Sequence, residues 1–231
     1  MSTQQNIHVV DLLFDMENPR LADSLSDQLS ILQAIASHQG KRLRYLAEDI
    51  VKFGLNPSDL FIVMASTTND NHYIVLEGNR RLAALRALHN PTAVMEAVPS
   101  SIFNAFTRLR DSYLEISITT IPCIVTENRV AARHWIELKH TGQMQGAGTV
   151  LWGTQESSRF RAQATKYPEL HIQALDFLQA RGDITSQFRS NFPATTLKRL
   201  IDTPMVRTKM GLDRKGQQLA RLGEEDDVVK I

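Results

Sequence analysis

Two hydrophobic periodicities alternate along the first 140 residues. Leu25, Leu29 and Leu32 recur at helical spacing, and Gly40 follows as a stop signal. The same spacing predicts further helices at residues 43–53, 81–89, 100–117 and 130–139. Short apolar runs predict strands at residues 8–13, 60–64, 73–76 and 119–125. Helices interleaved with strands place residues 1–142 in the α+β class.

The pattern changes beyond residue 150, where no strand signal is evident. Short helices are predicted at residues 158–167, 170–181, 185–189, 195–201 and 204–210. They predict a small all-helical domain over residues 150–222. The glycine-rich residues 141–148 favour a domain boundary or a mobile loop, and residues 223–231 favour an acidic tail.

Composition narrows the class of protein. The chain has 231 residues, of which 42% are hydrophobic and 22% charged, as in folded globular proteins. Its single cysteine, Cys123, excludes an intramolecular disulfide framework and a cysteine-cluster metal site. No apolar run approaches the ~20 residues that span a bilayer, and no secretory signal is visible. We therefore expect a cytoplasmic protein with no membrane contact and no protein-held metal.

Charge is distributed unevenly along the chain. Residues 1–154 carry 13 basic and 15 acidic side chains, a net charge of −2. Residues 155–221 carry 12 basic and 6 acidic side chains, a net charge of +6. This basic segment favours an anionic partner, with nucleic acid as the first candidate. A basic face that contacts only solvent is the alternative.

The segment Tyr73–Leu88 carries the clearest local motif: a strand, then Glu77-Gly78-Asn79-Arg80-Arg81, then a helix. Glycine at such a turn lets the backbone approach a ligand closely. The start of the helix offers unpaired N–H groups and the positive end of the dipole. Arg80 and Arg81 add guanidinium groups that suit phosphate. The turn therefore predicts a phosphate site; a capped helix with two solvent-facing arginines is the alternative.

Four segments in order resemble the ParB/sulfiredoxin-like superfamily. Residues 77–86 resemble its Gly-Glu-Arg-Arg box, and Asn18-Pro19-Arg20 resembles its early Asn-Pro-Arg box. Residues 46–57 and 121–125 resemble the segment before the ligand-binding strand and the closing Ile-Pro-Val strand. The resemblance covers residues 8–140 and implies a ParB/sulfiredoxin-like domain at residues 1–142.

The resemblance implies a nucleotide site. Partition-type members of this superfamily bind cytidine triphosphate in the box, and a helical DNA-binding domain follows. Gly78, Arg80 and Arg81 carry over as triphosphate contacts, together with Asn79, and Arg20 carries over as an arginine that faces nucleotide or DNA. We expect a nucleoside triphosphate (CTP, ATP or GTP) with Mg²⁺ and duplex DNA as partners, and leave a homodimer open.

This chain departs from the superfamily pattern at three places. Asn79 stands where the box has glutamate and cannot act as a base, so Glu77 becomes the candidate catalytic carboxylate. The later Glu-Asn-x-x-Arg box is not recognisable, and Glu137 or His140 is the candidate for its metal or phosphate role. The box has no sulfiredoxin-type cysteine, and Cys123 is expected to be buried and inert, so sulfinic acid reductase activity is not expected.

Residues 184–201 resemble a helix-turn-helix. Its second helix would present base-facing and backbone-facing side chains, namely Thr195, Thr196, Lys198 and Arg199. Phosphate contacts are expected from Arg189, Arg207, Lys209, Arg214 and Lys215. The leading hypothesis is a nucleotide-dependent DNA-binding protein acting in partition, regulation or phage defence. A metal-dependent nuclease or nucleotidase using Glu77 and Glu137 is the second, and a non-catalytic partner-binding module is the third.

Overall fold

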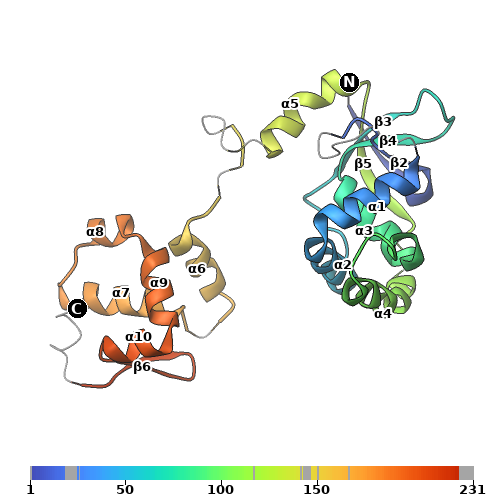
Figure 1. The fold of residues 1–231 in the computed structure, drawn as a ribbon. Helices are drawn as coiled ribbons and strands as arrows, with labels where there is room; N and C mark the ends of the chain where they lie inside the picture. Colours follow the sequence, from blue (N-terminus) through green and yellow to red (C-terminus); the bar gives the residue numbers. More distant parts are fainter. Residues whose placement is uncertain are drawn as a thin grey trace. The chain divides into compact units, whose positions relative to one another are not determined.

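The computed structural model describes residues 2–18, 25, 27–116, 118–140, 142, 147–149, 151–165 and 167–223, with Arg159 described by its main chain alone. It divides into two compact units, Met1–Thr149 and Val150–Ile231 (Figure 1). Arg20 and the acidic tail beyond residue 223 lie outside the described residues, as do most positions of the glycine-rich segment. No helix in these ranges is both long and apolar enough to cross a bilayer.

The first unit is built on a five-stranded mixed sheet in the order β1-β5-β3-β4-β2. The strands are β1 (Thr3–His8), β2 (Leu12–Phe14), β3 (Phe61–Ala65), β4 (Tyr73–Glu77) and β5 (Thr120–Thr126). β1 with β5 and β3 with β4 are antiparallel pairs, whereas β2 with β4 and β3 with β5 are parallel. The mixed sheet confirms the α+β class of this part of the chain.

The strand predicted at residues 8–13 is wrong in its bounds. The 3₁₀ turn η1 (Val9–Asp11) splits it, and β1 begins at Thr3, five residues earlier than predicted. β1 lies at the edge of the sheet, and only Ile7 among its residues is buried. A strand with one buried side chain has no hydrophobic alternation to recognise.

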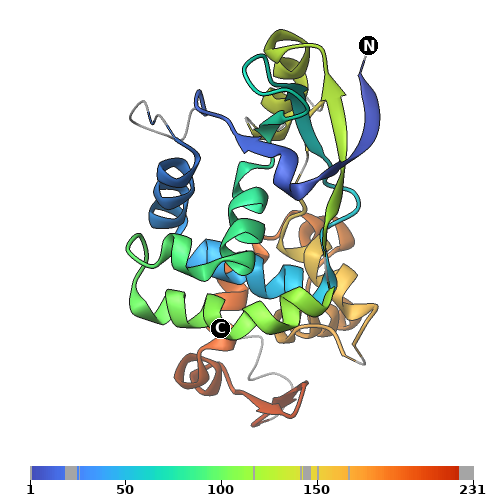
Figure 2. The ribbon, with the colours of Figure 1, turned by 90° about the vertical axis from the view of Figure 1, so that its right-hand side faces the viewer.

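Helices α1 (Gln28–Gln39), α2 (Lys41–Phe53), α3 (Asn79–His89) and α4 (Ser100–Ile116) gather beside the sheet (Figure 2). The short 3₁₀ helix η2 (Pro91–Val94) joins α3 to α4. α3 is the innermost helix: its apolar side chains from Leu82 to Leu88 are all buried. Because α3 is enclosed by neighbours, the turn before it holds a fixed position in the core.

One further helix of the first unit, α5 (Arg129–His140), is attached differently. Ala132 is its only buried residue. Asn128 caps its start, accepting a hydrogen bond from the Ala131 N–H at 3.0 Å. With so little apolar surface buried, α5 depends on polar contacts to hold it against the sheet.

The second unit contains α6 (Thr154–Ala162), α7 (Leu170–Arg181), α8 (Ser186–Asn191), α9 (Ala194–Asp202) and α10 (Pro204–Lys209). It also contains an antiparallel hairpin of β6 (Leu212–Lys215) and β7 (Gln218–Arg221). The prediction of an all-helical domain is therefore wrong. The missed signal is Gly216, which has a φ of +64° and begins a two-residue loop between short, mainly polar strands.

Candidate functional site

Gly78 occupies the junction between β4 and α3. Its φ of 112° and ψ of 6° place it in the left-handed region, which favours glycine. A Cβ atom built on it would lie 2.6 Å from a ring carbon of Phe61, which is 1% exposed. Both the backbone conformation and the space require glycine here. The tight turn brings the first N–H groups of α3 next to the end of β4.

Asn79 uses its side chain inside the protein. It is 7% exposed, its Nδ2 donates to the carbonyl of Val75 at 2.6 Å, and its Oδ1 accepts from the Asp15 N–H at 3.2 Å. The amide thereby joins the start of α3 to β4 and to the end of β2. Glutamate could not donate the bond to Val75 when ionised. This geometry accounts for asparagine at a position where the resembled box has glutamate.

The two arginines of the turn have different environments. Arg80 is exposed, and its side chain has no hydrogen-bond or ion-pair partner among the described residues. Arg81 is 8% exposed, and its guanidinium lies over the Phe61 ring with 4.5 Å between charge centre and centroid. It also pairs with Asp59 at 3.2 Å and with Glu77 at 3.5 Å. The alternative of two solvent-facing arginines is therefore wrong for Arg81.

The Glu77 carboxylate lies close to basic side chains from two helices, α3 and α5. Besides Arg81, Lys139 Nζ lies 3.1 Å from Oε1 and His140 Nε2 lies 2.7 Å from Oε2. Burial alone would raise the Glu77 pKa, but the hydrogen bond from His140 and the charge of Lys139 outweigh it and lower the pKa. Glu77 is therefore a firmly ionised carboxylate rather than a proton donor.

The structure thus brings together three predicted site residues, Glu77, Arg81 and His140, from segments 63 residues apart. It adds Asp59 and Lys139, which pair with each other and which the sequence did not single out. Glu137 lies exposed on α5 in the same turn as these cations. Among the described residues, no three His, Cys, Asp or Glu side chains gather as a metal site.

A second ion pair fixes the start of α5. Arg129 Nη1 donates to Asp15 Oδ2 at 2.7 Å, and Nη2 donates to Oδ1 of the same carboxylate. The Asp15 side chain is 4% exposed and follows β2 directly. The hydrogen bond with Asp15 raises the pKa of Arg129. Ion pairs therefore hold α5 at both ends, through Arg129 at one and Lys139 with His140 at the other.

Two further features lie near these residues. A cavity of about 310 Å³ is lined by Trp135, Leu138 and Lys139 of α5 and by residues 147–149. Lys139 therefore contacts both the cavity and Glu77. On β5, Cys123 is fully buried, and burial raises its thiol pKa to about 12. The thiol stays protonated, as expected for a buried structural cysteine.

In the second unit, several residues predicted to contact DNA already have partners within the protein. Arg189 pairs with Asp176, and Lys198 pairs with Asp202 at 2.9 Å and with Glu169 at 3.6 Å. Arg207 is 9% exposed and donates to the carbonyl of Ile201 at 2.8 Å. The remaining predicted contacts are exposed: Thr195, Thr196, Arg199, Lys209, Arg214 and Lys215. The four-residue spacing of Lys198 and Asp202 indicates their pairing, but the pairing of Arg189 with Asp176 and the burial of Arg207 depend on the tertiary fold.

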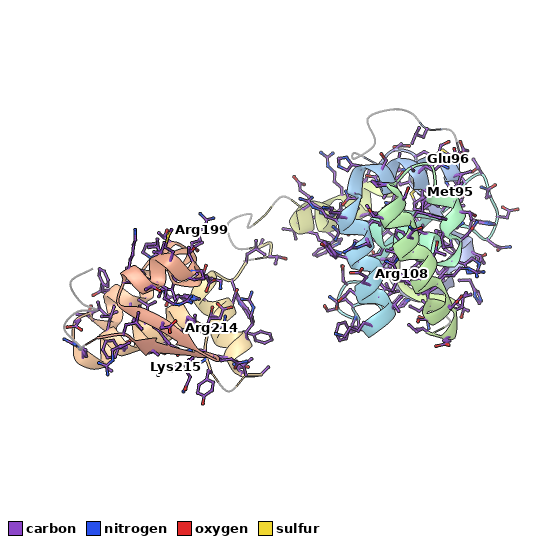
Figure 3. The ribbon with its side chains drawn as sticks, turned by 60° about the horizontal axis from the view of Figure 1, so that its bottom comes forward. Met95, Glu96, Arg108, Arg199, Arg214 and Lys215 are labelled. Carbon is purple, nitrogen blue, oxygen red and sulfur yellow. The ribbon has the colours of Figure 1, made fainter. Side chains whose placement is uncertain are left out.

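Two residues, Phe192 and Pro193, separate α8 from α9. Thr195 and Thr196 lie at the start of α9 and are exposed. The Thr195 hydroxyl lies 2.7 Å from that of Thr154 at the start of α6. Arg199 lies one turn further along α9 (Figure 3).

A buried histidine lies within the second unit. His171 of α7 is 0% exposed; its Nε2 lies 3.5 Å from Ser158 Oγ and its Nδ1 lies 3.6 Å from Glu169. Burial lowers the His171 pKa below 6.5; Glu169 and Asp202 oppose that shift and Lys198 reinforces it. The neutral imidazole is therefore the form that the folded unit favours.

Acid is expected to destabilise the second unit through His171. The folded state holds His171 with a lowered pKa. The contribution of this histidine to the free energy of unfolding is therefore complete above pH 6.5 and decreases as the pH falls below that value. Urea midpoints followed by Trp152 fluorescence, with Trp135→Phe as background, should be lower at acid pH. His171→Gln should reduce that dependence. An unchanged pH profile in His171→Gln would contradict the assignment.

Comparisons with known proteins add little to this geometry. No protein family and no curated protein matches the chain. A solved structure of the C-terminally truncated chromosome-partitioning protein ParB from Caulobacter crescentus, complexed with CTP-gamma-S, is similar at 12% identity with a TM-score of 0.38. That alignment covers 86% of this chain and 99% of the other. A TM-score this low does not establish a shared fold, so function has to be inferred from the residues of this chain.

Proposed function

We propose that the protein binds the phosphate chain of a nucleoside triphosphate at the start of α3 and binds duplex DNA through its second unit. The observation that carries the nucleotide site is Arg80, a cation without a partner among the described residues, beside the Gly78 turn. α3 has 11 residues, so the positive end of its dipole is well developed. Its first N–H groups lack intrahelical acceptors and suit phosphate oxygens.

The local charge also favours an anion. Arg81 and Lys139 pair with the two carboxylates Asp59 and Glu77, and Arg80, which has no partner among the described residues, adds one positive charge beside them. Lys139 also lines the adjoining cavity, which at about 310 Å³ lies at the lower end of ligand-pocket volumes. The nucleoside part of the ligand would lie there.

Mg²⁺ fits this site only as a companion of the phosphates. Both oxygens of Glu77 already have partners: Oε1 faces Lys139 and Arg81, and Oε2 lies 2.7 Å from His140 Nε2. The described residues offer no cluster of three ligating side chains. Mg²⁺ commonly keeps several waters and binds through substrate phosphates. Phosphate oxygens of the nucleotide, together with waters, would therefore supply most of the ligands of Mg²⁺.

The DNA interface proposed for the second unit centres on α9. Its N-terminal threonines are exposed, where a recognition helix reads base edges, and the exposed Arg199 would contact a backbone phosphate. The net charge of +6 over residues 155–221 supports an electrostatic attraction to the duplex. Nucleotide in the first unit would regulate this binding.

The test is a calorimetric titration of CTP, ATP and GTP with Mg²⁺, with and without duplex DNA. We expect one nucleotide to bind and Arg80→Ala to weaken it about 30-fold, the equivalent of about 2 kcal/mol for a charge-assisted contact. Arg108→Ala is the matched control, because Arg108 is an exposed arginine of α4 in the same unit (Figure 3). Equal affinity in wild type and Arg80→Ala would overturn the nucleotide site.

Hydrolysis is the second candidate function, and one distance favours it. His140 Nε2 and Glu77 Oε2 are 2.7 Å apart, so the carboxylate orients the imidazole as in a general-base pair. Release of inorganic phosphate in the same titrations separates binding alone from hydrolysis.

A further inference from the structure

The ion pairs of the second unit leave a small set of cations available. Arg161 pairs with Glu169, Arg181 with Asp183 and Arg189 with Asp176. Lys198 pairs with Asp202. The exposed cations without a carboxylate partner among the described residues are Arg199, Lys209, Arg214 and Lys215. Two of these four lie on β6, in the hairpin that the sequence analysis missed (Figure 3).

The hairpin is fixed to the helices at both strands. Leu212 of β6 is 3% exposed and anchors its start. Gln173 of α7 donates from Nε2 to the Gln217 carbonyl and accepts the Leu219 N–H at Oε1, both at 2.8 Å. An isolated two-stranded hairpin is marginally stable in water, so these contacts hold its geometry. The ribbon is therefore a rigid part of the second unit.

The tip of the ribbon is small and cationic. The loop residues are Gly216 and Gln217, and Arg214 Nε donates to the Gly216 carbonyl at 2.6 Å. Lys215 precedes the loop and is exposed. A glycine at the tip allows the backbone to approach another surface closely. A charged arginine and lysine beside such a tip suit phosphate oxygens.

We propose that the β6–β7 ribbon is a second DNA-contacting element, separate from α9, which places Arg214 and Lys215 on the phosphate backbone of a duplex. The proposal rests on the proposed DNA binding of the second unit. A two-stranded ribbon has the width to enter or border the major groove of B-form DNA. Phosphate contacts of this kind fix register and orientation and make affinity salt-dependent.

The experiment measures binding of the full chain to a labelled duplex by fluorescence anisotropy across a range of NaCl concentrations. Loss of two phosphate contacts in Arg214→Ala with Lys215→Ala should reduce the slope of log K against log salt by about 1.8. Between about 50 and about 200 mM NaCl, the factor by which Kd rises should then be about twelve times smaller in this variant than in wild type. Arg199→Ala should reduce the slope by about 0.9.

Two further variants make the result specific to the ribbon. Arg42→Ala with Arg108→Ala removes the same charge from exposed positions of the first unit and should keep the wild-type slope. Gln173→Ala releases the ribbon from α7 without changing charge and should weaken binding several-fold. Circular dichroism of each variant confirms its fold, and Arg214→Gln with Lys215→Gln repeats the test with bulkier side chains.

The outcomes separate this proposal from the one it rests on. If wild type shows no salt-dependent affinity for duplex, the proposed DNA binding fails and the ribbon contact fails with it. If wild type binds and Arg199→Ala reduces the slope, but the Arg214 and Lys215 variant keeps the wild-type slope, the ribbon proposal alone is overturned. A reduced slope in that variant, with an unchanged slope in the Arg42 and Arg108 control, supports the ribbon contact.

Discussion

Gly78→Ala is expected to destabilise the first unit by about 3 kcal/mol. A non-glycine residue in this left-handed conformation costs about 1–2 kcal/mol. The new Cβ would also meet the Phe61 ring at 2.6 Å. Phe61 is fully buried beneath Arg81, so it cannot move aside cheaply, and such overpacking costs about 1–3 kcal/mol. Urea denaturation followed by circular dichroism measures the sum.

Gly182→Ala is the control for the backbone cost of that substitution. Gly182, at the end of α7 in the second unit, is also left-handed, with a φ of 84° and a ψ of 7°, but a Cβ on it would meet nothing within 4 Å. Its substitution therefore carries a backbone cost, which lowers the stability of the second unit, without the steric one. Equal losses in the two variants would show that the contact between Gly78 and Phe61 is not rigid.

Arg129→Met is expected to cost the first unit about 3 kcal/mol. Asp15 is nearly inaccessible, and without the guanidinium the hydrogen bond that its carboxylate keeps within the described part of the chain is from the Glu17 N–H, at 2.9 Å. Removing one member of a buried ion pair leaves the other charge unpaired, which commonly costs about 3–5 kcal/mol. The lower figure applies because the Arg129 side chain is 32% exposed. Urea denaturation measures stability, and amide hydrogen exchange should show faster opening of α5.

Arg133→Met provides the control on the same helix. Arg133 lies one turn beyond Arg129, is exposed, and has no ion-pair partner among the described residues. A surface change of this kind is expected to stay within about 0.5 kcal/mol. If Arg129→Met is as mild as Arg133→Met, the Asp15 pair does not hold α5 in place.

The elements with a continuous apolar face could be predicted from sequence. α3 buries leucines and alanines at every turn, and α7 begins and ends at the predicted residues, 170 and 181. β1 and the β6–β7 hairpin could not be predicted from sequence, because Ile7 and Leu212 are the only buried residues in β1 and β6. Their position depends on partners elsewhere in the chain, which local periodicity does not encode.

The candidate site was likewise predictable only where its contacts are local in the sequence. Glu77 and Arg81 are four residues apart, so their pairing follows from the helical repeat. Asp59 joins them from the loop before β3, and Lys139 from the end of α5, and only the tertiary fold brings these in. Sequence alone also could not tell that Arg80 faces solvent while Arg81 lies against Phe61.

The order of strands in the sheet has a consequence for synthesis of the chain. β1, the first strand of this sheet along the chain, pairs within the sheet only with β5, through contacts such as Thr3 with Val125. Its backbone groups therefore lack sheet partners until β5, which ends at residue 126, has emerged from the exit tunnel of the ribosome. β1 is mostly polar, with Ile7 its one buried residue. That composition suits the strand of this sheet that stays unpaired longest during synthesis, because it offers little apolar surface for aggregation.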